Sequence, residues 1–235
     1  SRLVVKDFKE LLQARNEMEN RSQHWNKIYQ ARDETDLTWF ESPPTISHEL
    51  VVAHSEPGDT VIEIGGGASR LVDRLVADGY EAITVLDVSA AALKVSKKRL
   101  GEFAAKVTWI VADITAWAPM RTYALWHDRA VFHFLADPSE RAAYVAVMDA
   151  ALVPGGIAII ATFAEDGPQT CSGLPVARYS PAELAETIEE LAPGRFRSIE
   201  ARKHVHVTPK GNRQSFQVSA FKKTVQVRSG AFGVE

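Results

Sequence analysis

Apolar and polar positions follow two alternating periods along the chain from residue 57 onward. Short, continuous apolar runs occupy 60–64, 82–89, 107–114, the start of 123–135, and 157–163. Such runs are typical of strands that are buried on both faces of a parallel sheet. The segments between them place apolar residues at helical spacing, up to about residue 77, over 91–100 and over 138–152. The alternation predicts an α/β fold, with a mostly parallel sheet and helices on both of its faces.

The C-terminal part of the chain departs from this alternation. A polar loop over 164–180 is long enough to act as a lid, and a helix is expected at about 181–191. Two runs with partly alternating side chains then occupy 196–207 and 214–223. Since a turn separates them, they predict an antiparallel hairpin at the end of the sheet.

The N-terminal part reads as a separate helical and aromatic segment. Residues 3–20 have the spacing of an amphipathic helix, and the stretch 24–40 is rich in aromatic side chains. A further helix is expected over 46–54, after a pair of prolines. We therefore expect an N-terminal cap over 1–45 and an α/β domain over 46–235.

Composition restricts the class of partner. The chain has 235 residues, 46% of them hydrophobic, which is enough for one sizeable core. Its net charge of −3 gives no strong positive field for nucleic acid, and no apolar run approaches the ~18 residues of a membrane span. The single cysteine, Cys171, cannot form an intrachain disulfide, which fits a reducing, cytoplasmic environment. A small molecule is therefore the expected partner, with neither nucleic acid nor membrane.

A glycine turn and an acid predict a binding site for a nucleoside. Gly65, Gly66 and Gly67 follow the first apolar run, where the lack of a Cβ lets the backbone approach a ligand. Asp87 ends the second apolar run, at the position where a carboxylate accepts hydrogen bonds from ribose hydroxyls. Both features stand at strand ends that meet at one edge of a parallel sheet.

Two further residues bear on which nucleoside binds. Arg70 occupies the last glycine position of the dinucleotide fingerprint, which disfavours NAD. Glu63, two residues before Gly65, suits a cationic ligand better than a pyrophosphate. An NAD(P)-dependent oxidoreductase stays open as an alternative, as does a non-catalytic nucleoside-binding protein, because a fold alone does not prove activity.

The glycine turn also carries a resemblance to a known family. The segment VIEIGGGASRLVDRL, residues 61–75, resembles motif I of class I methyltransferases, which use S-adenosyl-L-methionine and release S-adenosyl-L-homocysteine. LDVS, residues 86–89, and VADITAW, residues 111–117, resemble the second and third motifs. The resemblance covers about residues 56–223. It implies a Rossmann-like, seven-stranded, mostly parallel sheet with one antiparallel strand.

The resemblance assigns roles to individual residues. Asp87 would bind the ribose, Asp113 would bind the adenine amino group, and Ile114 would pack on the adenine ring. The residues expected to bind the cofactor are Trp25, Tyr29, Trp39, Glu63, Gly65, Gly66, Gly67, Ser69, Arg70, Asp87, Val88, Ser89, Asp113, Ile114 and His127.

The N-terminal segment carries a closer resemblance. HWNKIY, residues 24–29, and LTWFE, residues 37–41, are similar to segments of the methyltransferases that modify lysines of elongation factor 1A and citrate synthase. In those methyltransferases the aromatic side chains of these segments help to close the cofactor site. The chain departs from that group after the fourth strand, where Asp128-Arg129-Ala130-Val131 replaces an acid–Lys–Gly–Thr run. We therefore expect a small-molecule acceptor, with a protein lysine as the alternative.

The end of the fourth strand supplies the candidates for catalysis. Ligands of open α/β sheets bind beyond the carboxyl ends of the strands, and an amine acceptor would have to lose a proton there. The catalytic candidates are Asp128, His127 and His133, and the substrate-binding candidates are Arg129, Phe132, Phe163 and Arg178. Arg178 would either bind a substrate carboxylate or pair with a carboxylate of the protein.

Cys171 and the pair His204 and His206 are not expected to take part in catalysis or metal binding. Cys171 is expected to be a small pocket residue, because methyl transfer needs no covalent enzyme intermediate. His204 and His206 alternate on one strand face without an acidic or cysteine partner nearby. We therefore expect a solvated strand face there and no metal site.

Overall fold

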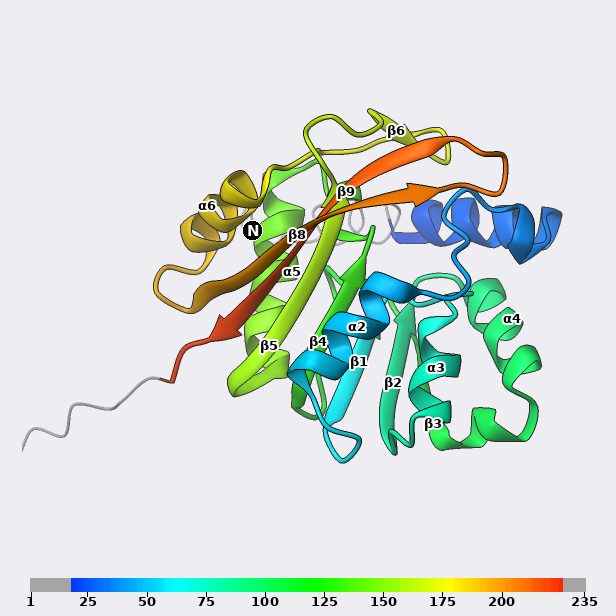
Figure 1. Cartoon of the computed structure of the whole chain (residues 1–235), viewed down its shortest axis with the longest axis horizontal. Helices are drawn as coiled ribbons and strands as arrows, with labels where there is room; N and C mark the ends of the chain where they lie inside the picture. The colour runs from blue at the N-terminus through cyan, green and yellow to red at the C-terminus, as the bar shows by residue number, and fades with distance from the viewer. Residues whose placement is uncertain (1–17, 226–235) are drawn as a thin grey trace, which may run out of the picture.

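The computed structural model of the chain describes residues 18–225, and its centre is a seven-stranded sheet in the order β3-β2-β1-β4-β5-β9-β8 (Figure 1). Only β9 runs against its neighbours, because it pairs antiparallel with both β5 and β8. The expected α/β, Rossmann-like fold with one antiparallel strand is confirmed. The strands are β1 Thr60–Ile64, β2 Ala82–Asp87, β3 Val107–Val111, β4 Tyr123–Arg129, β5 Leu152–Phe163, β8 Phe196–Val207 and β9 Arg213–Lys223.

Helices cover both faces of this sheet and divide the core in two. The apolar residues of α2, α3 and α4 pack with one face of the sheet, around side chains such as Leu50, Leu71 and Leu93. Those of α5 and α6 pack with the other face, around side chains such as Tyr144 and Leu184. The helices are α2 Thr45–His54, α3 Leu71–Ala77, α4 Ala90–Leu100, α5 Pro138–Ala151 and α6 Pro181–Leu191, with 3-10 turns η1 Glu34–Asp36, η2 Gly101–Lys106 and η3 Phe132–Phe134.

Local sequence explains where the helices begin. The Ser89 hydroxyl accepts a hydrogen bond from the Ala92 N–H at the start of α4. At α6, Ser180 and Glu183 form a reciprocal capping box, which satisfies N–H groups that the first helical turn leaves free. Ser89 lies two residues after Asp87 and its N–H donates to Asp87 Oδ1, so the cap of α4 also fixes the backbone at the predicted ribose site.

The fifth strand is longer than the sequence predicts. It begins at Leu152 instead of Ile157, because Leu152 already pairs with Tyr123 before the register shifts and Leu125 pairs with Ile157. The run Pro154-Gly155-Gly156 therefore lies at an irregularity inside the strand. The expected lid loop 164–180 also contains a small hairpin, β6 Thr170–Cys171 and β7 Leu174–Pro175.

The N-terminal part lies across the carboxyl ends of β2 and β3 (Figure 1). Residues 18–31 are helical, whereas most of the predicted helix 3–20 lies outside the described residues. The helix is attached to the ends of these strands by Ser22 Oγ, which donates to the Val88 carbonyl at 3.0 Å, and by Asn26 Oδ1, which accepts from Ser89 Oγ at 2.8 Å. The division into a cap over 1–45 and a domain over 46–235 stays a prediction.

Residues 18–225 contain no helix that is both long and apolar enough to cross a membrane.

Candidate functional site

A pocket opens where β1, β2, β3 and β4 end. Its empty space is about 820 Å³, part of which is open to solvent. A second, smaller pocket adjoins it beside the glycine turn and shares Gly65, Tyr29, Trp39 and Arg129 with it. The larger pocket is lined by Arg21, Trp25, Tyr29, Trp39, Ile64, Gly65, Leu86, Asp87, Val88, Ala112, Asp113, Ile114, Arg129, Ala130, Val131, Phe134, Leu135 and Cys171.

The glycine turn has the tight approach that its sequence predicts. Gly65 has φ +63°, and a Cβ there would lie 2.1 Å from Val131 Cγ2. Gly67 has φ +24°, and a Cβ there would lie 2.7 Å from Asp87 Oδ2. Both positions therefore require glycine, for backbone conformation and for space. The turn thus brings the end of β1 close to the carboxylate at the end of β2.

Asp87 presents its carboxylate to the larger pocket. The side chain is buried, and Oδ1 accepts a hydrogen bond from the Ser89 N–H at 2.7 Å. Burial raises the pKa of Asp87 to about 6, although hydrogen bonds from the backbone of Ser89 and Gly67 oppose that shift. A buried carboxylate with free lone pairs in a pocket is suited to accept hydrogen bonds from ligand hydroxyls.

Asp113 lies at the other end of the pocket, just beyond β3. Its Oδ1 accepts from the N–H and the hydroxyl of Thr115, and its Oδ2 accepts from Arg21 Nη1 at 2.7 Å. Arg21 also pairs with Glu140 on α5. The N-terminal helix is therefore tied to the acid that the sequence assigns to the adenine amino group. Ile114 is buried beside it.

Glu63 is a buried acid beside the smaller pocket. Burial is the largest cause that raises its pKa, to about 8. Its Oε2 has no hydrogen-bond partner among the described residues. Ser69 and Arg70 line the same pocket, where the Arg70 guanidinium pairs with Glu34 of η1. An acid in this state gains most from a ligand cation, which would stabilise its ionised form.

Aromatic side chains of the N-terminal part close one side of the larger pocket. Trp39 Nε1 donates to the Tyr29 hydroxyl at 3.1 Å. Trp25 lies edge-on to Trp39, with ring centroids 5.7 Å apart, and to Phe134 of η3, at 5.2 Å. The three predicted aromatics are thus in contact with each other and with the segment after β4.

Asp128, by contrast, points away from both pockets and toward α5. Its carboxylate is fully buried and accepts three hydrogen bonds, from the Val131 N–H at 2.8 Å, the Phe132 N–H at 3.0 Å and the Tyr144 hydroxyl at 2.6 Å. Burial raises the pKa of Asp128 to about 6. These contacts hold the turn after β4 to α5.

The two predicted catalytic histidines are also buried and line neither pocket. His127 lies between Glu63 on β1 and Ile159 on β5 in the sheet register, and neither of its ring nitrogens has a hydrogen-bond partner in the described structure. His133 Nδ1 accepts from the Phe163 N–H at 3.3 Å, and its Nε2 has no partner within residues 18–225. Burial lowers the pKa of both histidines to about 3, so both rings are neutral at pH 7.

Comparison with known proteins agrees with this geometry. Residues 61–156 match the family model described as a methyltransferase domain. The 1,6-didemethyltoxoflavin-N1-methyltransferase of Burkholderia thailandensis, solved with 1,6-didemethyltoxoflavin and S-adenosylhomocysteine, has a similar fold, with a TM-score of 0.64 at 17% identity. That similarity covers 94% of this chain and 90% of the other. Residues 61–156 therefore match a methyltransferase domain, and the chain has the fold of the solved methyltransferase.

Two curated relatives match the central part of the methyltransferase domain. The malonyl-[acyl-carrier protein] O-methyltransferase of Anoxybacillus flavithermus is 31% identical over 103 residues, which are 43% of this chain and 39% of the relative. The eEF1A lysine and N-terminal methyltransferase of Mus musculus is 28% identical over 92 residues, which are 39% of this chain and 13% of the relative. The matched part thus spans less than half of either relative.

The methyltransferase domain and the N-terminal part bring most of the predicted cofactor residues together. Eight line the larger pocket and three more, Glu63, Ser69 and Arg70, line the smaller one. The remaining four line neither of the two pockets: Gly66, Gly67, Ser89 and His127. The eight are Trp25, Tyr29, Trp39, Gly65, Asp87, Val88, Asp113 and Ile114.

Of the predicted substrate-binding residues, only Arg129 lines either of these two pockets. Phe132 and Phe163 are buried in the core, where Phe132 contacts the Tyr144 ring. Arg178 is exposed and donates to the carbonyls of Glu165 and Gly167, so it holds the lid loop. These contacts with backbone carbonyls are neither of the two expected uses, and a role of Arg178 in binding a substrate carboxylate stays a prediction.

Sequence reasoning missed several lining residues. Arg21 stands in a polar helical stretch without a motif, and Phe134 follows the strand-four end by several residues. Cys171 does line the pocket, as expected of a small pocket residue. Its burial raises the pKa of the thiol to about 11, which keeps it protonated at pH 7.

The expectation of a solvated face at His204 and His206 is wrong. His206 is buried, and its Nε2 lies 2.8 Å from the Thr38 carbonyl. His204 Nε2 lies 3.2 Å from Glu41 Oε1. Both side chains therefore face the segment that follows η1, and this segment covers that part of β8. The pattern of side chains along a strand does not show that another segment covers one of its faces.

Proposed function

We propose that this protein is an S-adenosyl-L-methionine-dependent methyltransferase that methylates a small molecule. One observation carries the proposal: Gly65, Asp87 and Asp113, which stand in three separate sequence motifs, line a single pocket with the aromatic side chains of the N-terminal part. A chance arrangement of motif residues would not place their polar groups around one cavity. The methyltransferase fold of the chain supports the same conclusion.

The chemistry of the lining residues fits the parts of this cofactor. Asp87 would accept hydrogen bonds from the ribose hydroxyls, and Asp113 would accept one from the adenine amino group, with Ile114 against the ring. The unpartnered, buried Oε2 of Glu63 fits a need for a ligand cation, which the cofactor's ammonium would supply. A dinucleotide would instead bring a pyrophosphate toward this acid.

The rest of the site supports transfer of a methyl group. The cofactor supplies a methyl group on a positively charged sulfur, which is intrinsically activated, so the protein mainly aligns the acceptor and excludes water. Trp25, Tyr29 and Trp39 would exclude water from this space and present aromatic faces to the cation. Transfer of the methyl group would leave S-adenosyl-L-homocysteine, which lacks the positive charge on sulfur.

The shape of the site favours a small acceptor over a protein side chain. The N-terminal helix lies over one side of the larger pocket, and Cys171 of the lid hairpin lines another. The Anoxybacillus flavithermus relative is named for a malonyl group on an acyl-carrier protein and the murine one for a lysine of a protein, so acceptors carried by a protein also belong in the test. Net charge −3 supports a partner other than nucleic acid, and the single free thiol supports a cytoplasmic location.

Calorimetry tests the cofactor first. We expect S-adenosyl-L-methionine and S-adenosyl-L-homocysteine to bind and NAD not to bind. Mass spectrometry of metabolite extracts and of size-fractionated cell lysate, incubated with the protein and labelled donor, then detects the methylated product. We expect label in the small-molecule fraction. Label in the protein fraction alone would favour an acceptor carried by a protein, such as a lysine, and binding of NAD in place of both adenosyl compounds would overturn the proposal.

A further inference from the structure

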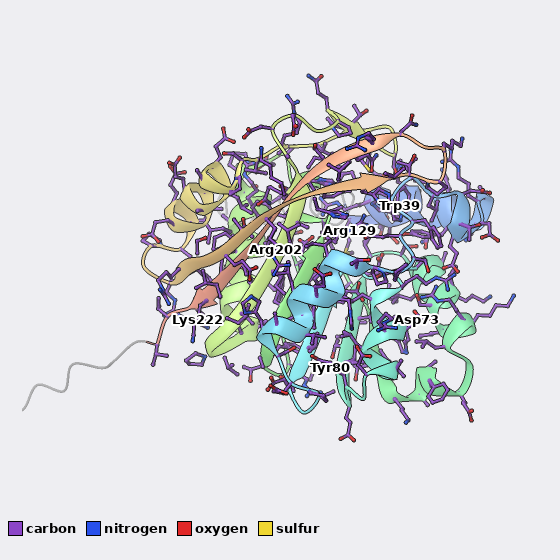
Figure 2. All side chains as sticks on the ribbon, in the orientation of Figure 1. Trp39, Asp73, Tyr80, Arg129, Arg202 and Lys222 are labelled. Carbon is purple, nitrogen blue, oxygen red and sulfur yellow. The ribbon has the colours of Figure 1, made fainter. Side chains whose placement is uncertain are left out.

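Arg129, the last residue of β4, carries a buried positive charge on the wall between the two pockets. Its side chain is only 14% exposed. Nη1 donates to the Trp39 carbonyl at 3.0 Å. Figure 2 labels both residues. Nη2 lies 3.4 Å from Glu41 Oε2, yet neither of these atoms has a hydrogen-bond partner among the described residues. The guanidinium therefore keeps N–H donors for a further acceptor.

The charge of Arg129 is only partly compensated by Glu41. The other oxygen of that carboxylate, Oε1, faces His204 at 3.2 Å, so Glu41 is shared between two basic groups. Hydrogen bonding to His204 and the charge of Arg129 hold the pKa of Glu41 below its usual range despite its burial. Burial lowers the pKa of Arg129 itself, because its charged form is poorly solvated there.

Sheet order places Arg129 on the side of the site that adenosine does not use. Asp87 and Asp113 follow β2 and β3, which lie on one side of β1, whereas β4 lies on the other. On that side Arg129 shares the larger pocket with Ala130, Phe134 and Cys171. These are the side chains left over for an acceptor once the adenosine end is assigned.

None of the proton acceptors that line the larger pocket is available to take a proton from an acceptor bound beside Arg129. Among residues 18–225, the lining groups that can take up a proton are Asp87, Asp113, Tyr29 and Cys171. Asp87 and Asp113 belong to the adenosine end, and burial raises the pKa of Tyr29 well above its usual value. Since Cys171 is protonated at pH 7, an ammonium acceptor would find no group here to take its proton.

A positive acceptor would also be repelled. The cofactor brings a sulfonium, and a third positive charge beside it and Arg129 would be unfavourable in a space of low dielectric constant. An anion would relieve this repulsion and use the free donors of the guanidinium. The observations on charge, donors and proton acceptors thus point the same way.

We propose that the acceptor is an anionic small molecule whose carboxylate, or other compact anion, binds to Arg129. This inference rests on the proposed function. An anion needs no base: its oxygen or sulfur forms the new bond to the methyl carbon, and the donor sulfur keeps the electron pair of the broken C–S bond. The reaction releases no proton, and it neutralises both the negative charge of the acceptor and the positive charge of the sulfonium. A carboxylate has two oxygens, so one accepts from Arg129 while the other reacts.

The test compares three planar probes that differ mainly in charge: benzoate, benzamide and benzamidine. Each is titrated by calorimetry into the protein saturated with S-adenosyl-L-homocysteine. We expect benzoate to bind at least about tenfold more tightly than benzamide, because only the carboxylate can form a hydrogen bond with Arg129 in which both partners are charged. Benzamidine is expected to bind least. If S-adenosyl-L-homocysteine failed to bind, the result would count against the proposed function. The experiment therefore separates failure of the proposed function from failure of the anionic-acceptor proposal.

Variants assign the preference to Arg129. Arg129→Gln should abolish the preference for benzoate, Arg129→Lys should keep part of it, and the exposed Arg197→Gln serves as the control that keeps all of it. Circular dichroism checks the fold, and the wild-type titrations stand even where Arg129→Gln fails to fold. Equal binding of benzoate and benzamide to the wild-type protein would overturn the proposal.

A second result would also overturn it. Arg129→Gln could weaken the binding of S-adenosyl-L-homocysteine by tenfold or more while 5′-methylthioadenosine, which lacks the amino-acid part, bound as before. That result would mean that Arg129 binds the carboxylate of the cofactor. Unchanged affinity for both ligands is the result expected here.

Discussion

Asp87 and Asp128 stand at the ends of two strands of one sheet, and burial raises the pKa of both carboxyls to about 6. Their surroundings differ. The Asp128 carboxylate accepts hydrogen bonds from two backbone N–H groups and from Tyr144, and it lines neither pocket. Asp87 lines the larger pocket and accepts only from nearby backbone N–H groups.

The difference shows what a raised pKa does and does not indicate. Burial alone accounts for the direction of both shifts, so the pKa does not distinguish a ligand-binding acid from a structural one. The partners do, because a carboxylate whose lone pairs are occupied by the protein has none left for a ligand. We infer that Asp128 is a positioning residue for the turn after β4. Its predicted catalytic role stays a prediction that the variants below test.

The largest expected effect is on stability, at Asp128. Asp128→Ala leaves the N–H groups of Val131 and Phe132 and the hydroxyl of Tyr144 without their acceptor. Each buried donor without a partner costs about 1–3 kcal/mol, so the three together should lower the free energy of unfolding by about 3–9 kcal/mol. Urea denaturation followed by circular dichroism measures this loss.

Affinity for S-adenosyl-L-homocysteine provides the contrast for the same variant. It should stay within about threefold of the wild-type value in the folded protein, since Asp128 contacts neither pocket. Asp128→Asn, which keeps the shape, should lose less stability. A stable Asp128→Asn protein whose turnover per folded molecule fell by ~10²–10⁴ would restore Asp128 as a catalytic residue.

The next largest effect is on affinity, at Asp87. Asp87→Ala removes the acceptor of two ribose hydroxyls, so affinity for S-adenosyl-L-homocysteine should fall by about 2–4 kcal/mol, or roughly 30- to 1000-fold. The ligand-free protein should unfold at the same temperature or a higher one, because at pH 7 the variant no longer buries a charge. Calorimetry and thermal melts measure the two. An unchanged affinity would remove the ribose assignment.

The adenosine end of the site could be predicted because its determinants are local in the sequence. Gly65 to Gly67 and Asp87 follow their strands directly, and parallel strands bring such ends to one edge. The strand pattern likewise located β1 and β8 correctly. It missed the early start of β5, because the pairing of Leu152 with Tyr123 depends on register between strands and not on the composition of either.

The fourth-strand end could not be predicted, because its roles depend on which way each side chain points. β4 continues to Arg129, and successive side chains of a strand point to opposite faces, so Asp128 faces α5 and Arg129 faces the pockets. Tyr144 stands on a separate helix, and Arg21 reaches Asp113 from 92 residues away. Contacts of this kind follow from tertiary packing and leave no local signal.

The smallest expected effect is a pH dependence that only Asp87 should produce. Ribose hydroxyls donate to the ionised carboxylate, so binding needs Asp87 without its proton, and the pKa of that group in the free protein is about 6. Affinity should therefore be fully present above pH 7 and fall as the pH drops through 6, by about tenfold between pH 7.5 and 5. The ligand for this measurement is 5′-methylthioadenosine, because it lacks the ammonium that Glu63 would bind.

Controls separate Asp87 from the other buried acids. Adenine alone carries no ribose, so its affinity should not change over this range, and Asp87→Asn should bind 5′-methylthioadenosine weakly and equally at both pH values. Asp128 titrates over the same interval, but Asp128→Asn should keep the full tenfold change because that carboxylate does not face the ligand. A dependence that disappeared in Asp128→Asn and persisted in Asp87→Asn would reverse the comparison between the two acids. A wild-type affinity that did not vary with pH would mean that the ribose hydroxyls do not donate to Asp87.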